Sequence, residues 1–365
     1  MNTGMWFRHL ATVVLAGFFL IAVLPAEAGD GFQVGVYYYP GWRDQTVGSV
    51  SATPWDALRH YPERMPVLGA YRDGAPEIVA QQIQWMADYG IDYVVFDWYW
   101  NHKLGVLKSH AIDGFFASSQ RSRLKVSLMW ANHTEFPQSA EQFDAMVTAW
   151  LGYFAHPEYL RIDGKPVVFI FSADQLEQKV RVFGQSGAAM LERARVIARE
   201  AGLPGIYLIG GVNANSSIVA KPGAGSGYDA MSAYNYHGPA TLSYASGRRE
   251  SHSYDELDAG YRDQWQWMEA HGSLPFVVPM TAGWDHRPWG SSVDPMHDES
   301  RSTASEFGVH LRAARAFMEA HAHQTQRTGV ICCWNEYGEG AFIEPTRDQG
   351  FSYLEQVREV FGVAR

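Results

Sequence analysis

The sequence predicts an α/β protein built as a single (β/α)8 TIM barrel with a long loop after the first strand. Eight short apolar runs alternate with longer amphipathic runs along the chain, which is the order expected of repeated strand–helix units. The short runs are apolar almost without interruption, as is typical of parallel strands buried on both faces. An open, doubly wound sheet is the alternative. The lack of a glycine-rich dinucleotide-binding fingerprint after the first run disfavours it.

The expected strands are rich in Val, Ile, Tyr and Phe, and they lie at Gln33–Tyr39, Tyr93–Trp98, Lys125–Trp130, Val167–Phe171, Tyr207–Gly211, Ala230–Tyr234, Phe276–Met280 and Val330–Trp334. The expected helices show apolar residues at helical spacing, and they lie at Pro76–Tyr89, Ser139–Phe154, Gly187–Ala201, Tyr254–Ala270 and Ser302–His321. The first helix begins with a proline and stops before a glycine, as helices often do. The segment Asn213–Gly227 is rich in Gly and Ser and is expected to be irregular.

Length and composition agree with this fold and exclude other classes of protein. One barrel of roughly 250 residues with insertions accommodates a chain of 365 residues. The chain has 29 Lys and Arg against 39 Asp and Glu, a net charge of −10, which argues against a nucleic-acid-binding surface. Charged residues make up 19% and aromatic residues 14% of the chain. That composition excludes a disordered protein and suits ring surfaces for an apolar or sugar-like ligand.

The N-terminus has the pattern of a secretory signal peptide. Arg8 precedes the apolar run Leu10–Leu24, and the small residues Ala26 and Ala28 mark a cleavage site after Ala28. A membrane anchor is the alternative, but the run is shorter than the roughly 20 residues that a span needs. We therefore expect residues 1–28 to be removed and residues 29–365 to form a secreted or periplasmic domain with no stable membrane span.

The chain has two cysteines, Cys332 and Cys333, which are neighbours in the sequence. They cannot form a long-range crosslink within one chain. A vicinal disulfide is conceivable but strained, so we expect two reduced, buried thiols in a strand.

The carboxyl ends of the strands carry the chemistry of the predicted site. In a TIM barrel these ends and the loops after them form the active site, and the long loop Gly41–Ala75 is expected at the same mouth. Aromatic rings stack on the apolar faces of sugars, while amide, carboxylate and imidazole groups bond to hydroxyl groups. The predicted substrate-binding residues are Tyr38, Trp42, Asp97, Trp98, Tyr99, Asn132, His133, Tyr236, His237, Trp284, Asp285, Arg287, Trp334 and Asn335.

Glu336 and Glu339 are the candidate catalytic residues. They flank a turn with two glycines after the eighth strand, and cleavage of a glycosidic bond needs two carboxyl groups whose pKa values differ. The alternative is that both form salt bridges in a loop, because acidic pairs are common.

Other residues at the strand ends leave alternatives open. Asp97 is either an acceptor for a substrate hydroxyl group or a buried carboxylate with a partner in the barrel. Arg287 binds an acidic substrate group or pairs with Asp285. His133, His237 and His286 lack the close spacing of metal ligands, so we expect hydrogen bonding from them, no metal and no cofactor.

Five motifs in order resemble the glycoside hydrolase family 99-like domain, which includes the WbsX-type proteins of bacterial polysaccharide clusters. They are VGVYYYPGW at Val34–Trp42, YPERMPVLGAY at Tyr61–Tyr71, YGIDYVVFDWYW at Tyr89–Trp100, GWDHRPWG at Gly283–Gly290 and WNEYGEGAFIEPT at Trp334–Thr346. The resemblance extends from Val34 to about Pro345, and the last motif is the most specific. GWDHRPWG matches loosely, so Asp285 and Arg287 are expected to select a different sugar.

The resemblance implies a (β/α)8 glycosidase that retains configuration at α-mannoside-type linkages of a polysaccharide or oligosaccharide. By similarity, Glu336 matches the residue that deprotonates the sugar 2-hydroxyl group, which attacks the anomeric carbon and gives a 1,2-anhydro sugar. Glu339 matches the general acid that protonates the leaving oxygen and then activates water. Such an intramolecular nucleophile gains from proximity.

Two other functions remain open at this point. One is a glycosyltransferase or transglycosylase of cell-surface polysaccharide, and the other is a non-catalytic carbohydrate-binding barrel. Hydrolysis is favoured over transfer because the chain has no nucleotide-sugar signature and an exported protein does not normally meet nucleotide sugars. The presence of both glutamates in the motif argues against a silent barrel.

Overall fold

The computed structural model describes residues 1, 31–47, 50–219, 221, 223–240 and 250–362. The chain divides into two units, Met1–Gly31 and Phe32–Arg365, and every described helix and strand belongs to the second unit. The predicted signal peptide lies outside the described residues except for Met1. None of the helices described here is long and apolar enough to cross a membrane.

Eight parallel strands form the barrel, and each lies beside its neighbour in chain order. They are β1 (Gln33–Tyr38), β4 (Tyr93–Asn101), β6 (Lys125–Trp130), β8 (Lys165–Ile170), β9 (Tyr207–Gly211), β10 (Ala230–Ser232), β11 (Val278–Thr281) and β14 (Thr328–Cys332). The last strand returns to the first, since β14 pairs with both β11 and β1. The junction between β10 and the segment that leads into β11 closes the barrel. There the amide of Met231 donates to the carbonyl of Pro275, and its carbonyl accepts from the amide of Val277, both at 2.9 Å. The predicted barrel is confirmed.

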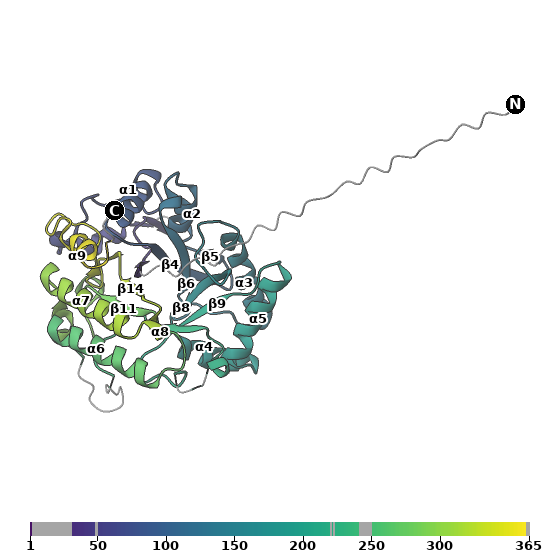
Figure 1. Cartoon of the computed structure of the whole chain (residues 1–365). Coiled ribbons are helices and arrows are strands. Elements are labelled where there is room, and N and C mark those ends of the chain that lie inside the picture. The colour runs from purple at the N-terminus through teal and green to yellow at the C-terminus, as the bar shows by residue number, and fades with distance from the viewer. Residues whose placement is uncertain (2–30, 48–49, 220, 222, 241–249, 363–365) are drawn as a thin grey trace. The chain divides into compact units, whose positions relative to one another are not determined.

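The helices surround the strands on the outside of the barrel (Figure 1). They are α1 (Pro76–Asp88), α2 (His110–Ala117), α3 (Ala140–Phe154), α4 (Ala173–Val180), α5 (Gly187–Glu200), α6 (Tyr254–His271), α7 (Ala304–Ala320), α8 (Ala322–Thr325) and α9 (Ser352–Phe361). Side-chain oxygens of Ser or Thr cap the first turns of α3 to α7, as expected from their preference for this position. The five predicted helices agree with α1, α3, α5, α6 and α7. The short helices α2, α4, α8 and α9 were not predicted.

Eight further short strands among the described residues lie outside the closed barrel sheet. They are β2 (Gln45–Val47), β3 (Val50–Ala52), β5 (Gly105–Leu107), β7 (Arg161–Ile162), β12 (Gly283–Trp284), β13 (Ser300–Arg301), β15 (Asn335–Glu336) and β16 (Ala341–Phe342). β5 pairs antiparallel with the extended end of β4. β15 and β16 form the hairpin that holds the candidate catalytic glutamates.

Alternate residues of each barrel strand pack on opposite sides, as strand geometry requires. On β4, Val94, Phe96 and Trp98 join a cluster that includes the buried faces of the helices. Tyr93 and Val95 belong to a second cluster, formed mainly by residues of the other strands. The core therefore has two parts. One group of side chains packs between the strands and the helices, and a second group packs inside the barrel.

Cys332 and Cys333 form a disulfide bond with each other, so the expectation of two reduced thiols is wrong. The expectation assumed that both residues belong to one regular strand, where neighbouring side chains point to opposite faces. In the structure β14 ends at Cys332, and the peptide bond to Cys333 is cis. Both residues are completely buried.

The long loop after β1 packs against the β15–β16 hairpin. Its aromatic residues Trp42, Trp55 and Tyr71 form a third buried cluster with Tyr337 and Phe342 of the hairpin. The indole N–H of Trp42 donates to the carbonyl of Asn335 at 2.8 Å. The loop therefore packs against the hairpin that contains Glu336 and stabilises its position.

Candidate active site

A cavity of about 560 Å³ lies among the residues that follow the carboxyl ends of the barrel strands. Its volume falls within the range of about 300–1,000 Å³ that is usual for ligand pockets. Every barrel strand supplies lining residues from its end or from the segment after it, and for β1 this residue is Tyr39. Among the residues that the sequence analysis selected, the cavity is lined by Asp97, Tyr99, His133, Tyr236, His237, Trp284, Glu336 and Glu339.

The other selected residues do not line the cavity, and these are Tyr38, Trp42, Trp98, Asn132, Asp285, Arg287, Trp334 and Asn335. The structure corrects their expected placement, because seven of them are buried in contacts with the protein itself. The Asn132 carboxamide, for example, accepts from the amide of Ser172 at 2.9 Å and donates to its carbonyl at 2.8 Å. The Tyr38 hydroxyl group donates to Asp73 at 2.8 Å. Side chains alternate along a strand, so only part of each strand end faces the mouth.

Asp285 and Arg287 bind each other and Arg64. Arg287 donates to Asp285 from Nε at 2.8 Å and from Nη2 at 2.6 Å. Arg64, whose side chain is fully buried, contacts the same carboxylate at Oδ2. Burial alone would raise the pKa of Asp285, but the hydrogen bonds and charges of the two arginines outweigh it and lower that pKa. Of the two alternatives for Arg287, the structure supports pairing with Asp285.

Arg64 also fixes the backbone of the turn between the two candidate glutamates. Its Nη1 donates to the carbonyl of Tyr337 at 2.9 Å and to that of Asp285 at 3.0 Å. The amide of Asp285 in turn donates to the carbonyl of Glu339 at 2.6 Å. The turn that bears Glu339 is therefore tied to the segment after β12 at two points.

The local structure explains why this turn has glycine at positions 338 and 340. Gly340 has a φ of 69°, in the left-handed region that glycine adopts at little cost. A Cβ atom on Gly338 would collide with the indole ring of Trp289. Trp289 lines the cavity, is 37% exposed and stacks on Trp42 with ring centroids 5.8 Å apart.

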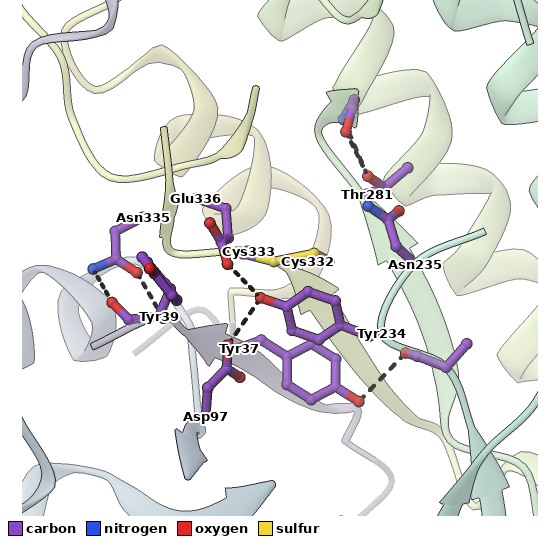
Figure 2. The surroundings of a disulfide bond; sticks show 12 residues. Tyr37, Tyr39, Asp97, Tyr234, Asn235, Thr281, Cys332, Cys333, Asn335 and Glu336 are labelled. Atoms are coloured by element: carbon purple, nitrogen blue, oxygen red, sulfur yellow. Dashed lines mark hydrogen bonds between the residues drawn. A yellow bond between two sulfur atoms is a disulfide. The ribbon is translucent and has the colours of Figure 1, made fainter. Parts of the chain in front are cut away.

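The centre of the site is a tyrosine hydroxyl group between two carboxyl groups. Figure 2 shows Tyr234 with its hydroxyl oxygen 3.0 Å from Asp97 Oδ2 and 3.0 Å from Glu336 Oε1. Asp97 lies on β4, Glu336 on β15, and Tyr234 two residues after β10. Three distant segments of the chain thus meet at one hydroxyl group.

Sequence reasoning missed Tyr234 although it lies beside Tyr236 and His237, which were selected. It was placed as the last residue of the strand Ala230–Tyr234, whereas β10 ends at Ser232. The signal that could have identified it is its place at a strand end, where several aromatic and polar residues follow one another. The cavity has further lining residues that were not selected, including Tyr39, Lys108, Phe171, Asp174, Asn213 and Trp289.

Three carboxyl groups that line the cavity, those of Asp97, Glu336 and Glu339, have pKa values raised above those of ordinary carboxyl groups. Burial raises the pKa of Glu339 to about 7. Burial, with the charges of Glu339 and Asp97, raises the pKa of Glu336 well above its usual value. Desolvation of this kind disfavours the charged form of any acid. A group with a pKa near neutrality suits general acid–base catalysis.

Lys108 is the one lysine or arginine among the described residues that line the cavity. Its ammonium group lies 4.8 Å and 4.7 Å from the ring centroids of Tyr39 and Tyr99, and it donates to the Tyr39 hydroxyl group at 3.3 Å. Burial lowers the pKa of Lys108, while the charges of Glu336 and Asp97 oppose this shift.

His133 and His237 line the cavity and contact different neighbours. His133 packs against Phe171 with centroids 4.1 Å apart, and burial together with Lys179 lowers its pKa to about 4. His237 Nδ1 lies 2.9 Å from His297 Nε2. Within the described part of the chain, no three His, Cys, Asp or Glu residues are grouped as metal ligands would be.

Comparison with known families gives a match over most of the chain. Residues 50–357 match the family described as "Glycosyltransferase WbsX". The chain belongs to this family. A curated relative, the uncharacterized protein WxcX of Xanthomonas campestris pathovar campestris, is 23% identical over 321 residues. The match covers 82% of this chain and 44% of that protein, so the WbsX-family chain described here spans less than half of its relative's length.

Solved structures share the fold of this WbsX-family protein. A glycoside hydrolase-like protein superimposes with a TM-score of 0.66 at 17% identity, over 95% of this chain and 98% of the other. The GH99 endo-alpha-mannosidase from Bacteroides thetaiotaomicron superimposes with a TM-score of 0.59 at 15% identity, over 90% of this chain and 96% of the other. At these identities the similarity establishes the fold alone, which is the barrel described above.

Proposed function

We propose that the protein is an exported glycoside hydrolase that cleaves 1,2-trans linkages of the α-mannoside type, such as α-mannosyl or α-rhamnosyl linkages, with retention of configuration. The observation that carries the proposal is the presence of Glu336 and Glu339 in one cavity at the carboxyl end of the barrel. Aromatic walls that include Tyr99 and Trp284 suit the faces of sugar rings. The shared fold with a GH99 endo-alpha-mannosidase supports the substrate class.

In the first step, Glu336 as carboxylate takes the proton of the sugar 2-hydroxyl group. The 2-oxygen then attacks the anomeric carbon, and the bond from this carbon to the leaving oxygen breaks. Glu339 as carboxylic acid gives its proton to that oxygen. The products of this step are a 1,2-anhydro sugar and the free leaving group, with the proton now on Glu336 and the negative charge on Glu339.

In the second step, Glu339 takes a proton from water while the water oxygen attacks the anomeric carbon. The bond from this carbon to the 2-oxygen opens, and Glu336 returns its proton to the 2-oxygen. Two inversions at one carbon give net retention. Each glutamate ends in its starting state, so the pair needs one shared proton, as coupled carboxyl groups provide.

A glycosyltransferase is the second candidate, and the description of the family favours it. The two activities are separated by incubating the purified protein with α-mannan, rhamnan and bacterial surface polysaccharides, with and without nucleotide-activated sugars. Hydrolysis predicts new reducing ends without any activated donor. Chain extension that depends on the donor, with no release in its absence, would overturn the proposal in favour of transfer. Binding of a polysaccharide without turnover would overturn both activities and support a non-catalytic carbohydrate-binding protein.

Glu336→Gln tests the proposed base within the same assay. The change removes the proton acceptor while keeping the size of the side chain, and we expect kcat to fall by about 10²–10⁴-fold with polysaccharide binding retained. Glu319→Gln is the matched control, since Glu319 is exposed on α7 away from the cavity. Turnover that survives in the Glu336 variant would contradict its role.

The pH dependence of kcat/KM tests the role of Glu339. This residue must carry a proton to release the leaving oxygen, and its pKa is about 7. The protonated form is lost as the pH rises through that value, so kcat/KM on a glycan is expected to fall above about pH 7. A series of rates between acidic and alkaline pH measures this limb. A rate that keeps rising through pH 8 would contradict the assignment.

Export is part of the proposal and has its own test. Expression with and without residues 1–28 in a bacterial host, followed by fractionation, should place the full chain outside the cytoplasm and the truncated chain inside it. N-terminal sequencing of the exported form is expected to begin at Gly29. Full-length protein retained in the cytoplasm would contradict this part of the proposal.

A further inference from the structure

We propose that Asp97 is protonated in the resting enzyme and is the first donor of a hydrogen-bond chain that runs through Tyr234 to Glu336. Asp97 is then a positioning residue, because it acts on the candidate base through the tyrosine. The protonation state of Asp97 follows from the geometry of the site. The purpose assigned to it rests on the proposed function of Glu336.

The first argument is the number of hydrogens. The Tyr234 hydroxyl group lies 3.0 Å from one oxygen of Asp97 and 3.0 Å from one oxygen of Glu336. A phenol has one hydrogen and donates once, while an ionised carboxylate only accepts. If both carboxyl groups were charged, one of the two contacts would place two oxygens together with no hydrogen between them. One carboxyl group must therefore donate to the tyrosine oxygen.

The second argument decides which group holds the proton. Asp97 is 4% exposed, and its Oδ1 is buried without a hydrogen-bond partner. A buried carboxylate with an unpaired oxygen is very unfavourable, whereas the carbonyl oxygen of a neutral acid tolerates this position far better. No oxygen of Glu336 is buried and unpaired in the described structure. The charge therefore belongs on Glu336 and the proton on Asp97.

The surrounding charges agree with this assignment. Burial raises the pKa of Asp97 well above its usual value, and the charge of Glu339 raises it further. The hydrogen bond from Tyr234 and the charge of Lys108 act in the opposite direction but do not reverse the shift. Tyr39 and Tyr99 line the same cavity as Asp97. Their pKa values are raised mainly by burial, so they stay neutral phenols.

A neutral Asp97 has a purpose in the proposed reaction. Glu336 must be ionised to take the 2-hydroxyl proton, and a second negative charge on the far side of Tyr234 would oppose that. The protonated Asp97 donates to the tyrosine oxygen and directs the tyrosine hydrogen toward Glu336. The carboxylate of Glu336 gains a donor, and its orientation toward the cavity is fixed.

Asp97→Asn is the direct test, because an asparagine resembles the neutral acid and donates to Tyr234 through its amide group. The readout is the acid limb of the pH profile of kcat/KM, and we expect Asp97→Asn to leave the midpoint of that limb unchanged, since no charge is removed. If Asp97 is ionised, the same change removes a negative charge beside Glu336. The acid limb would then move to lower pH by about one unit, and the proposal would be overturned.

A measurement without substrate separates this proposal from the function of the enzyme. Infrared difference spectra at neutral pH detect the C=O stretch of a protonated carboxyl group. We expect the wild-type spectrum to contain such a band that Asp97→Asn removes and Glu336→Gln keeps. A band that Glu336→Gln removes instead, or none that depends on Asp97, would overturn the assignment. Circular dichroism of each variant establishes that it is folded.

Discussion

Glu339→Gln is expected to lower kcat/KM on an unactivated glycan by about 10³-fold, within the range of about 10²–10⁴ that general acid catalysis contributes. The leaving oxygen of a glycan is a poor leaving group unless it is protonated as the bond breaks. Glutamine has nearly the same shape as a protonated glutamate but gives no proton. Initial rates of reducing-end release, measured at a series of substrate concentrations, give the ratio.

The chemistry of the leaving group separates loss of the acid from a damaged site. An aryl glycoside with a strongly acidic phenol needs little protonation, so the first step of the variant should proceed within about tenfold of the wild-type rate. Hydrolysis of the anhydro sugar then lacks its base, and a burst of phenol followed by slow turnover is expected. Equal losses on both substrates would contradict the acid assignment, and Glu319→Gln is the control that should change neither rate.

The fold could be predicted from the sequence because parallel barrel strands are buried on both faces. Runs such as Tyr93–Trp98 and Lys125–Trp130 are apolar throughout, and the structure places both in the barrel sheet. Helices with a clear apolar stripe, such as α6 and α7, were also predictable. The helices α2 and α4 have eight residues each, which is too short for a periodic pattern to stand out from the loops.

The site could be predicted only in part, because its position follows from strand order but the direction of each side chain does not. Asp97 and Trp98 are adjacent on β4, yet Asp97 faces the cavity while Trp98 packs against Trp150 of α3. Lys108 reaches the site from the residue after β5, a strand of three residues that pairs with the end of β4. Nothing in the local sequence signals that pairing.

The long loop after β1 is a second case of partial success. Its length indicated a functional segment, but none of its described residues lines the cavity. Its role is indirect, because Trp42 and Arg64 hold the segments that contain Asn335 and Tyr337. Reasoning from the length of the loop placed it at the site, while only the structure shows that it packs against the outer side of the turn with the candidate catalytic residues.

Arg64→Ala is expected to lower the free energy of unfolding by about 3–5 kcal/mol, the range for breaking a buried ion pair by removing one partner. The Arg64 side chain is fully buried and bonds to Asp285 and to the carbonyls of Asp285 and Tyr337. Alanine would remove the donor that the two carbonyls share, leave the Tyr337 carbonyl with only the Gly340 amide at 3.4 Å, and create a void. Urea unfolding at neutral pH measures the loss.

Arg287→Ala is the matched control, because Arg287 pairs with the same carboxylate but its side chain is 51% exposed. An exposed ion pair is worth about 0–1 kcal/mol and weakens with added salt, so this variant should lose little stability. The effect of Arg64→Ala should depend little on salt, since the Arg64 side chain is fully buried and screening by ions acts mainly on exposed pairs. Because Arg64 also ties down the turn before Glu339, kcat should fall in the Arg64 variant and stay near wild type in the Arg287 variant. Equal stability losses in the two variants would show that Arg64 does not hold this turn as the contacts indicate.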